Sequence, residues 1–434
     1  MKVAIVGAGW AGCAAAVEAT RLGHHVTLYE ASRALGGRAR RVNVMHQGKR
    51  LALDNGQHIL IGAYAETLQL MADVGVNIAR SLLRLPLTLK FPDGSGLRLL
   101  NLPAPIDALA GILAARGWSW LDKLSLLRVA IGWQLGGFKC DARQSVSDLC
   151  KELTSNVMAS LIEPLCVSAL NTPAARASGQ VFLRVMQDSL FASKAKKGGS
   201  NLLLPLVDLS ALMPDAAAAW LQRQGGEVKL GTRVQSILPN QNRWQLVTQT
   251  SEVADSSRSF DAAILACPPL EAARLTRTSG LPCEAWLTQI QALQYEAITT
   301  VYAMAPGARL SQPMLALRAS HAHPAQFVFD RGQLGGHTEM NDLLAFVISA
   351  SEGDSATLSQ QVAAQAADQL GLKDLQVVQT IVEKRATFAC TPGLQRPGMQ
   401  IAPGLLACGD YLEGPYPATL EGAVRSGLAA VRSF

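Results

Sequence analysis

The stretch that decides the fold is residues 3–12, which read V-A-I-V-G-A-G-W-A-G. Four apolar residues at its start predict a short buried strand, and the alanine-rich residues 11–22 predict a helix directly after it. Gly23 stands where helices commonly end in a left-handed residue, and residues 26–29 predict a second strand. The sequence therefore predicts a β-α-β unit near the N-terminus.

The turn between this strand and helix carries the spacing G-x-G-x-x-G at Gly7, Gly9 and Gly12. The first glycine permits a tight turn, the second lets the backbone approach a pyrophosphate, and the third lets the helix pack on the strand. The free N–H groups at the helix N-terminus, around Ala11, favour the phosphate charge. Glu30 follows Gly12 by 18 residues, close to the spacing expected for a carboxylate that binds ribose hydroxyls.

A second glycine motif, Leu35-Gly36-Gly37-Arg38, follows Glu30. Its two glycines permit another close approach of the backbone to a ligand, and Arg38 can place its forked, positively charged guanidinium near the pyrophosphate. At this spacing the motif resembles the second signature of the amine oxidase and phytoene desaturase flavoprotein superfamily. That resemblance favours FAD over NAD as the cofactor.

Three further segments resemble the same superfamily. Asp54-Asn55-Gly56-Gln57-His58 matches a loop that lies against the flavin, Val234 matches a strand residue whose backbone contacts adenine, and 407–410 with 419–423 match the closing FAD motif. The resemblance implies that Asp410 binds the ribityl or phosphate region and that a helix after Thr419 points its N-terminus at the flavin. The implied FAD-binding residues are Gly7, Gly9, Ala11, Gly12, Glu30, Gly36, Gly37, Arg38, Gly56, Gln57, Val234, Gly409, Asp410, Thr419, Leu420 and Glu421.

The rest of the chain predicts an α/β architecture with two domains. Residues 65–187 have mainly helical periodicity, with Leu149, Leu153 and Val157 among the repeats. Strands are expected at 227–230, 233–237, 244–248, 262–265, 298–304, 326–330, 343–349 and 404–407, helices at 358–370 and 420–434, and turns at 225–226, 231 and 239–240. We expect a Rossmann-like FAD-binding domain from residues 1–64, 200–275 and 386–434. A mixed sheet-and-helix substrate domain would comprise 65–199 and 276–385.

Composition excludes several classes of protein. The 434 residues are 49% hydrophobic and 17% charged, yet no charge-free run reaches the 18 or so residues of a membrane span. With no targeting segment recognised, we expect a cytoplasmic protein. The net charge of +6 is scattered and aromatic residues make up only 5%, which argues against nucleic acid as a partner. Eight cysteines without metal-ligand spacing predict reduced thiols and no metal site.

Residues 102–138 carry Trp118, Trp120 and Trp133 among leucines and basic residues. This stretch either makes peripheral contact with the inner face of an anionic membrane or forms core helices of the substrate domain. The lysine-containing loop 193–197 is a second candidate for contact with anionic lipid, although such loops are usually only solvated.

Interior motifs at 53–64, 102–105, 163–173 and 203–209 resemble the squalene-associated FAD-dependent desaturase family over nearly the whole chain. Its members are understood as hydroxysqualene dehydroxylases of bacterial hopanoid synthesis. The resemblance implies a long apolar isoprenoid substrate, hydroxysqualene, whose allylic carbon receives hydride from FADH2 N5 as the hydroxyl departs. It also implies an electron donor, as yet unidentified, that reduces the flavin.

The acid that protonates the departing hydroxyl is the least determined part of the site. His58 and Gln57 are candidates because the resemblance brings their loop to the flavin, and Glu163 and Asn171 are weaker candidates. All four residues can instead have structural roles, with His58 and Gln57 bonding the flavin or the backbone. No histidine or cysteine is placed for a covalent flavin link, so we expect the FAD to dissociate.

Three alternatives stay open. A carotenoid-type desaturase would share fold, cofactor and substrate class, and only the direction of electron flow would differ. An amine oxidase needs an aromatic cage, to which only Tyr411 and Tyr416 near the closing motif could contribute. A binding or escort protein without redox chemistry would be expected to lose the flavin contacts and to be colourless when purified.

Overall fold

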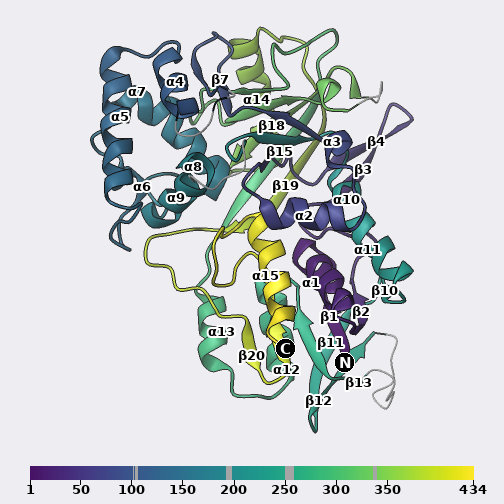
Figure 1. Ribbon diagram of the computed structural model, residues 1–434. Helices are drawn as coiled ribbons and strands as arrows, with labels where there is room; N and C mark the ends of the chain where they lie inside the picture. Colours follow the sequence, from purple (N-terminus) through teal and green to yellow (C-terminus); the bar gives the residue numbers. More distant parts are fainter. Residues whose placement is uncertain (101, 103–105, 192–197, 250–258, 336–339) are drawn as a thin grey trace.

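The computed structural model describes residues 1–100, 102, 106–191, 198–249, 259–335 and 340–434 (Figure 1). Its first layer is a six-stranded sheet in the order β10-β2-β1-β14-β21-β20. All neighbouring pairs are parallel except β20 with β21. The strands are β10 (Glu227–Lys229), β2 (His25–Tyr29), β1 (Lys2–Val6), β14 (Ala262–Leu265), β21 (Leu405–Ala407) and β20 (Gln400–Ala402). This is the predicted Rossmann-like α/β layer.

The first β-α-β unit forms as predicted. Helix α1 (Trp10–Arg21) is buried along ten of its twelve residues, and Gly23 adopts a positive φ of 81° after it. The last helix, α15 (Leu420–Arg432), lies beside α1 and contacts it (Figure 1). A Cβ at Gly427 would stand only 2.2 Å from the carbonyl oxygen of Ala11. The two helices therefore approach closely because α15 has a glycine at their contact.

The second layer is a five-stranded antiparallel sheet in the order β16-β17-β18-β15-β19. Its strands are β16 (Met314–Ala316), β17 (Phe327–Asp330), β18 (Leu343–Ser349), β15 (Tyr295–Met304) and β19 (Gln376–Phe388). Along β18, Phe346 and Ile348 pack with α14 (Ser355–Leu370), whereas Ala345 and Val347 join the main core on the opposite face. Side chains alternate across a sheet, so those of β18 point to both faces, and both faces are covered.

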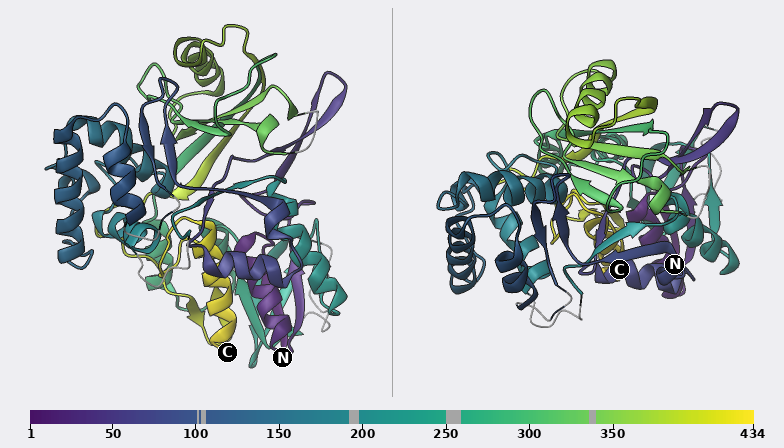
Figure 2. Two further views of the ribbon diagram at one scale, coloured as in Figure 1. Left: turned by 45° about the horizontal axis from the view of Figure 1, so that its top comes forward. Right: turned by 90° about the horizontal axis from the view of Figure 1, so that it is seen from above.

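A helical region lies to one side of this sheet (Figures 1 and 2). It contains α4 (Ile106–Ala114), α5 (Trp120–Leu135), α6 (Val146–Leu149), α7 (Ser155–Val157), α8 (Glu163–Leu170) and α9 (Gly179–Met186), with π-helical turns at Met158–Ile162 and Gln187–Phe191. The remaining elements include the hairpin of β3 (Arg41–His46) and β4 (Lys49–Asp54), helix α2 (Ala65–Asp73), helix α11 (Pro214–Arg223), and the small sheet of β11 (Val234–Asn240), β12 (Arg243–Thr248) and β13 (Ser259–Phe260).

One local prediction is wrong and another is incomplete. Residues 65–187 are mainly helical, as expected, but they also contain three short strands that were not predicted, β6 (Leu82–Leu85), β7 (Thr88–Lys90) and β8 (Gly96–Arg98). In and around β7, Leu87, Leu89 and Phe91 are buried at the strand spacing of two. The turn expected at 239–240 lies instead at 241–242, since Pro239 and Asn240 still pair with β12. The six strands of the first layer all come from the three segments proposed for the FAD-binding domain, whose boundaries stay a prediction.

Within the described ranges, no helix is long and apolar enough to cross a membrane. The long charge-free run at residues 3–17 is instead buried in β1 and α1. All eight cysteines are free thiols and seven of them are buried.

The close contact between α1 and α15 gives a stability prediction. Gly427→Ala should lower the free energy of unfolding by about 1–3 kcal/mol, because its new methyl group overlaps Ala11. Gly132→Ala is the matched control, since a Cβ there meets nothing within 4 Å on an exposed part of α5. That control should raise the free energy of unfolding by up to about 1 kcal/mol. Urea unfolding measures both, and equal effects of the two substitutions would contradict the packing described.

Candidate active site

A cavity of about 740 Å³ lies where the two layers meet. On one side it is lined by residues at the carboxyl ends of β1, β2, β14 and β21, the edge at which open α/β sheets bind ligands. On the other side it is lined by residues of β15, β17, β18, β19, α8 and α9. The cavity therefore joins a dinucleotide-type edge to the face of the second sheet.

The two glycine motifs meet at this edge. Gly7 has a φ of 110°, and a Cβ there would lie 2.6 Å from the carbonyl oxygen of Ala266. Gly9 begins α1 with no side-chain cap and forms an isolated β-bridge with Gly36. A Cβ on Gly37 would lie 3.2 Å from the Cα of Gly9. Bare backbone therefore faces the cavity at the N-terminus of α1, where a pyrophosphate would be stabilised.

Glu30 lines the cavity beside these glycines. One carboxylate oxygen accepts the Ala8 N–H at 2.8 Å, and the other accepts the Ser32 N–H at 2.8 Å. A carboxylate has about four acceptor positions, so two remain for the hydroxyls of a ribose. The predicted role of Glu30 is thus compatible with its position.

Arg38 connects the second glycine motif to the closing motif. Its Nη2 donates to Asp410 Oδ1 at 2.5 Å and its Nη1 donates to the Ala386 carbonyl at 2.5 Å. Burial lowers the pKa of Arg38, but the charge and hydrogen bond of Asp410 raise it overall, so the guanidinium stays charged. Both side chains line the cavity, where they offer a positive fork and a carboxylate to a bound dinucleotide.

Several buried polar atoms at this cavity lack a partner within the described chain. They are Gln57 Nε2, the Tyr295 hydroxyl and the Tyr411 hydroxyl, each on a residue that lines the cavity. Buried donors normally have partners, so these three fit a ligand that carries acceptors. The residues present therefore suit a polar, extended cofactor with ring and ribityl oxygen or nitrogen acceptors.

Gln57 and His58 both line the cavity, as the sequence predicted for their loop. Gln57 Oε1 accepts from Arg331 Nη1 at 3.1 Å, which leaves its amide N–H groups directed elsewhere. His58 Nδ1 lies 2.7 Å from the Gly56 carbonyl oxygen, a contact that requires an N–H on this nitrogen. Burial lowers the pKa of His58 and the charge of Arg38 lowers it further, whereas the bond to Gly56 acts in the opposite direction. The neutral imidazole that results is a weak acid catalyst.

Most of the other predicted cofactor residues, including Ala11, Gly56, Gly409, Thr419 and Leu420, also line the cavity. Two do not. Gly12 lies behind the turn, where a Cβ would be 1.9 Å from the Gly7 carbonyl oxygen, so its role is packing of α1. The Glu421 carboxylate is fully buried and accepts from Thr67 N, Thr67 Oγ1 and Arg425 Nε. Its side chain therefore joins α15 to α2, which leaves the backbone of Glu421 for the predicted cofactor contact at the N-terminus of α15.

Val234 lines the cavity, and its carbonyl oxygen accepts from Arg274 Nη2 at 3.1 Å. A carbonyl oxygen has two lone pairs, so this bond leaves one for the predicted backbone contact with adenine.

The weaker acid candidates are held by structural bonds. Glu163 accepts the Ala174 N–H, and burial raises the pKa of this carboxyl. Asn171 lines the cavity, but its amide donates to Thr387 and accepts from Ala350. These contacts favour the structural interpretation for both side chains.

The two tyrosines considered for an aromatic cage have different neighbours. Tyr416 packs edge-on against Tyr64 and lies near Arg425, and its ring is buried. Tyr411 lies against Gly409, where a Cβ would be 2.5 Å from the tyrosine ring. No contact between the two rings is present in the described structure.

Sequence reasoning missed the contribution of β19 to the cavity. Glu383, Arg385 and Thr387 all line it from this strand, and Asn55 Nδ2 donates to Glu383 Oε2 at 3.1 Å. Residues 376–388 read Q-V-V-Q-T-I-V-E-K-R-A-T-F, a β-branched run that could have been recognised as a strand. Tyr295 at the start of β15 was missed as well, since the expected strand began three residues later.

Gly7, Gly9, Gly36 and Gly37 form a glycine cradle at the carboxyl edge of the parallel strands. This cradle, with Glu30 beside it, defines a dinucleotide-binding protein. Comparison with known proteins specifies which kind. The sequence model of the family of flavin containing amine oxidoreductases matches residues 10–433. The chain belongs to this family and is a flavin-dependent oxidoreductase.

Individual relatives cover the whole chain. The hydroxysqualene dehydroxylase of Rhodopseudomonas palustris is 27% identical over 99% of this chain and 97% of its own, and that of Zymomonas mobilis is 25% identical over 98% and 97%. The zeta-carotene desaturase of Synechocystis is 44% identical, but over only 17% of this chain. Among solved structures, an oxidoreductase from Methanosarcina mazei superposes with a TM-score of 0.72 at 15% identity, covering 100% of both chains, which shows the shared fold.

The neutral state of His58 gives a pH prediction. Because its pKa is lower in the folded chain than in the unfolded chain, the unfolded state binds more protons below pH 6.5, and stability is lost as the pH falls through this range. His58→Gln should therefore lose less unfolding free energy than the wild type between pH 7.5 and pH 5.5, as measured by urea unfolding. His321→Gln, at an exposed imidazole, is the control and should behave like the wild type. Equal pH dependence in both variants would show that His58 is not buried as a neutral group.

Proposed function

We propose that this protein catalyses the FAD-dependent reductive removal of the hydroxyl group of hydroxysqualene, which yields squalene. The proposal draws on the two hydroxysqualene dehydroxylases that align with 98–99% of the chain, and on the chemistry of the cavity beyond the glycine cradle. FAD fits as the dinucleotide because the second glycine motif, Arg38 and Asp410 continue the cradle past the pyrophosphate position.

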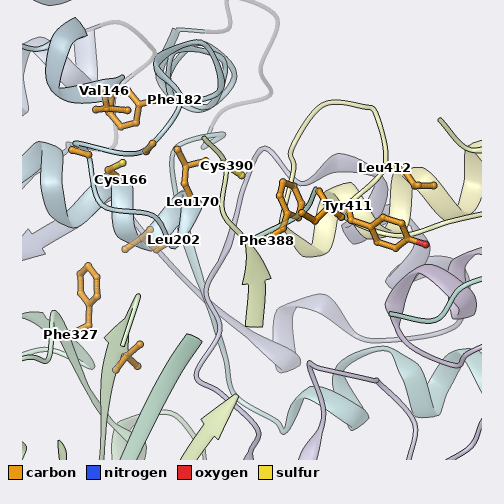
Figure 3. Close-up of a cluster of buried hydrophobic side chains, with 14 of the residues drawn as sticks. Val146, Cys166, Leu170, Phe182, Leu202, Phe327, Phe388, Cys390, Tyr411 and Leu412 are labelled. Carbon is orange, nitrogen blue, oxygen red and sulfur yellow. The ribbon is translucent and has the colours of Figure 1, made fainter. Parts of the chain in front are cut away.

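The observation that carries the proposal is the apolar part of the cavity. Leu202 and Phe327 lie in one buried apolar region together with residues of the helical side (Figure 3). Leu87, Leu89, Leu165, Val185, Met186, Leu202, Met314, Phe327, Phe329 and Val347 line this part of the cavity. Burial of an alkyl group contributes about 0.8 kcal/mol per CH2, so such a lining favours a long hydrocarbon chain. A small polar amine would gain little from it.

The chain's own residues would act on the substrate in three ways. The apolar lining would hold the isoprenoid extended and exclude water from carbon that becomes electron-deficient as the C–O bond breaks. Gln57 Nε2 and the Tyr295 hydroxyl, which have no partner among the residues that the structure describes, would donate hydrogen bonds to the departing oxygen or to the cofactor. Burial raises the pKa of Tyr295, which keeps its proton available for donation. Reduced FAD, when bound, supplies the hydride, so that hydroxysqualene and FADH2 become squalene, water and FAD.

A desaturase of a carotenoid-type isoprenoid is the second candidate, because an apolar cavity next to a flavin suits that substrate class equally. It would draw hydride from the substrate instead of delivering it. The partial alignment with zeta-carotene desaturase, over 17% of the chain, gives it less support than the full-length alignments give the dehydroxylase.

The test is a single turnover without oxygen. Holoprotein reduced with dithionite is mixed with hydroxysqualene, the flavin absorbance is followed, and the product is extracted for mass spectrometry. We expect one squalene for each flavin that reoxidises. Squalene itself is the control substrate and should leave the flavin reduced, because it has no hydroxyl to lose.

Two results would contradict the proposal. One is a flavin that stays reduced in the presence of hydroxysqualene. The other is the formation of a desaturated product when oxidised holoprotein meets phytoene or zeta-carotene. The second result would assign the desaturase reaction to the same cavity.

A further inference from the structure

Apolar side chains are exposed mainly in one region of the protein. Of the seventeen large hydrophobic residues exposed in the described chain, ten fall between residues 100 and 135. They belong to α4, to α5 and to the segment just before α4. On α5, Trp120 is 69% exposed, Leu121 70% and Leu135 85%. Monomeric soluble proteins rarely expose a contiguous apolar patch of this kind without a binding function.

Helix α5 is apolar on two opposite faces. Leu126 and Val129 point into the core. At 100° per residue, Trp120, Leu121, Leu124, Ile131 and Leu135 all fall within about 100° of one another on the other side of the helix. The inner face explains how α5 packs, whereas the outer apolar face has no such role within the described chain. On α4, Ile106, Leu109 and Leu113 continue the exposed surface at helical spacing.

Positive charges predominate around this face. Residues 98–139 contain Arg98, Arg116, Lys123, Arg128 and Lys139. The acidic residues in the same range are Asp107 and Asp122, and both are buried. Lys123 Nζ lies 5.1 Å from the centre of the Trp120 ring and donates to the Leu113 carbonyl. An apolar face that carries tryptophan and is bordered mainly by cations, of which Arg128 pairs with the exposed Glu152 at 3.4 Å, matches the surface of an anionic lipid bilayer.

The face also adjoins the cavity. Helix α4 packs on β8, and the β7–β8 hairpin carries Leu89, which lines the cavity. Ser200 lines the cavity too, and its hydroxyl donates to Asp107 of α4 at 3.4 Å. One layer of structure thus separates the exposed face from the apolar part of the cavity. A water-insoluble ligand in a bilayer would be close to the place where it binds.

We propose that the α4–α5 face, defined by Ile106, Leu109, Trp120, Leu124, Ile131 and Leu135, docks on an anionic lipid bilayer. A second copy of the chain is a poorer occupant. A twofold contact through this face would bring Arg116, Lys123 and Arg128 of one copy against the same cations of the other, and among the described residues only Arg128 of the three has an acidic ion-pair partner, Glu152. Binding to lipid is independent of the reaction proposed above, so either proposal can fail alone.

The test is flotation of the holoprotein with two kinds of vesicle. One is phosphatidylcholine alone, and the other also contains about 30% phosphatidylglycerol, which gives the membrane an appreciable negative surface potential. We expect flotation with the anionic vesicles. Leu124→Gln/Ile131→Gln should reduce the bound fraction on the order of tenfold or more, because two alkyl side chains no longer enter the bilayer. Arg116→Gln/Arg128→Gln should weaken binding about 10- to 30-fold, and added salt should have the same effect.

Matched controls are available on other surfaces. Met45→Gln/Leu230→Gln changes two exposed apolar residues, and Lys49→Gln/Arg50→Gln removes two exposed charges from the β3–β4 hairpin. Both controls should float like the wild type. Unfolding and flavin content, measured on every variant, ensure that the comparison is between folded proteins.

The proposal is overturned if the wild type does not float with anionic vesicles, or if the α4–α5 variants float as the controls do. It is also overturned if sedimentation velocity shows a wild-type dimer that Leu124→Gln/Ile131→Gln converts to a monomer with unchanged vesicle binding. The face would then be an interface between copies.

Discussion

The structure of the site depends on one ion pair, between Arg38 and Asp410, whose atoms lie 2.5 Å apart although the residues are 372 positions apart in sequence. Charged groups removed from water are costly unless they are paired, so the second glycine motif and the closing motif are held together at this point. Arg38 also reaches β19 through the Ala386 carbonyl, and its own carbonyl accepts from Asn55. Four separated segments are thereby fixed around the cavity.

The cavity that this pair organises has two chemical halves. The half beside the Rossmann-like sheet offers backbone N–H groups, Glu30 and Arg38, which suit phosphates and ribose. The half beside the second sheet is lined by side chains such as Phe327 and Val347, which suit hydrocarbon. A flavin between the halves would face an apolar ligand. The exposed apolar face of α4 and α5 lies one layer outside the second half, so the proposed lipid docking and ligand binding would take place in one region.

Much of the first half could be predicted from sequence because its constraints are local. The glycine spacing and Glu30 specify a turn, a helix N-terminus and a strand end within 30 residues, and the structure has all three. The second half depends on contacts between distant segments, so β19 and the strands around Leu87 were missed. Glu421 shows the same limit, since its motif position did not indicate that its carboxylate bonds Thr67 in a helix 354 residues away in sequence. The exposure of Trp120 beside the buried Trp118 likewise could be decided only by packing.

The most direct test is a titration of apo-protein with FAD, followed by the change in flavin fluorescence. Arg38→Gln removes the charge that pairs with Asp410, and charged hydrogen bonds contribute about 1.5–3 kcal/mol, so FAD affinity should fall about 10- to 100-fold. Arg41→Gln is the matched control, because Arg41 pairs with Asp208 and Asp215 and does not line the cavity. It should bind FAD like the wild type. Equal affinity of the Arg38 variant and the wild type would contradict the account of how this cavity holds its cofactor.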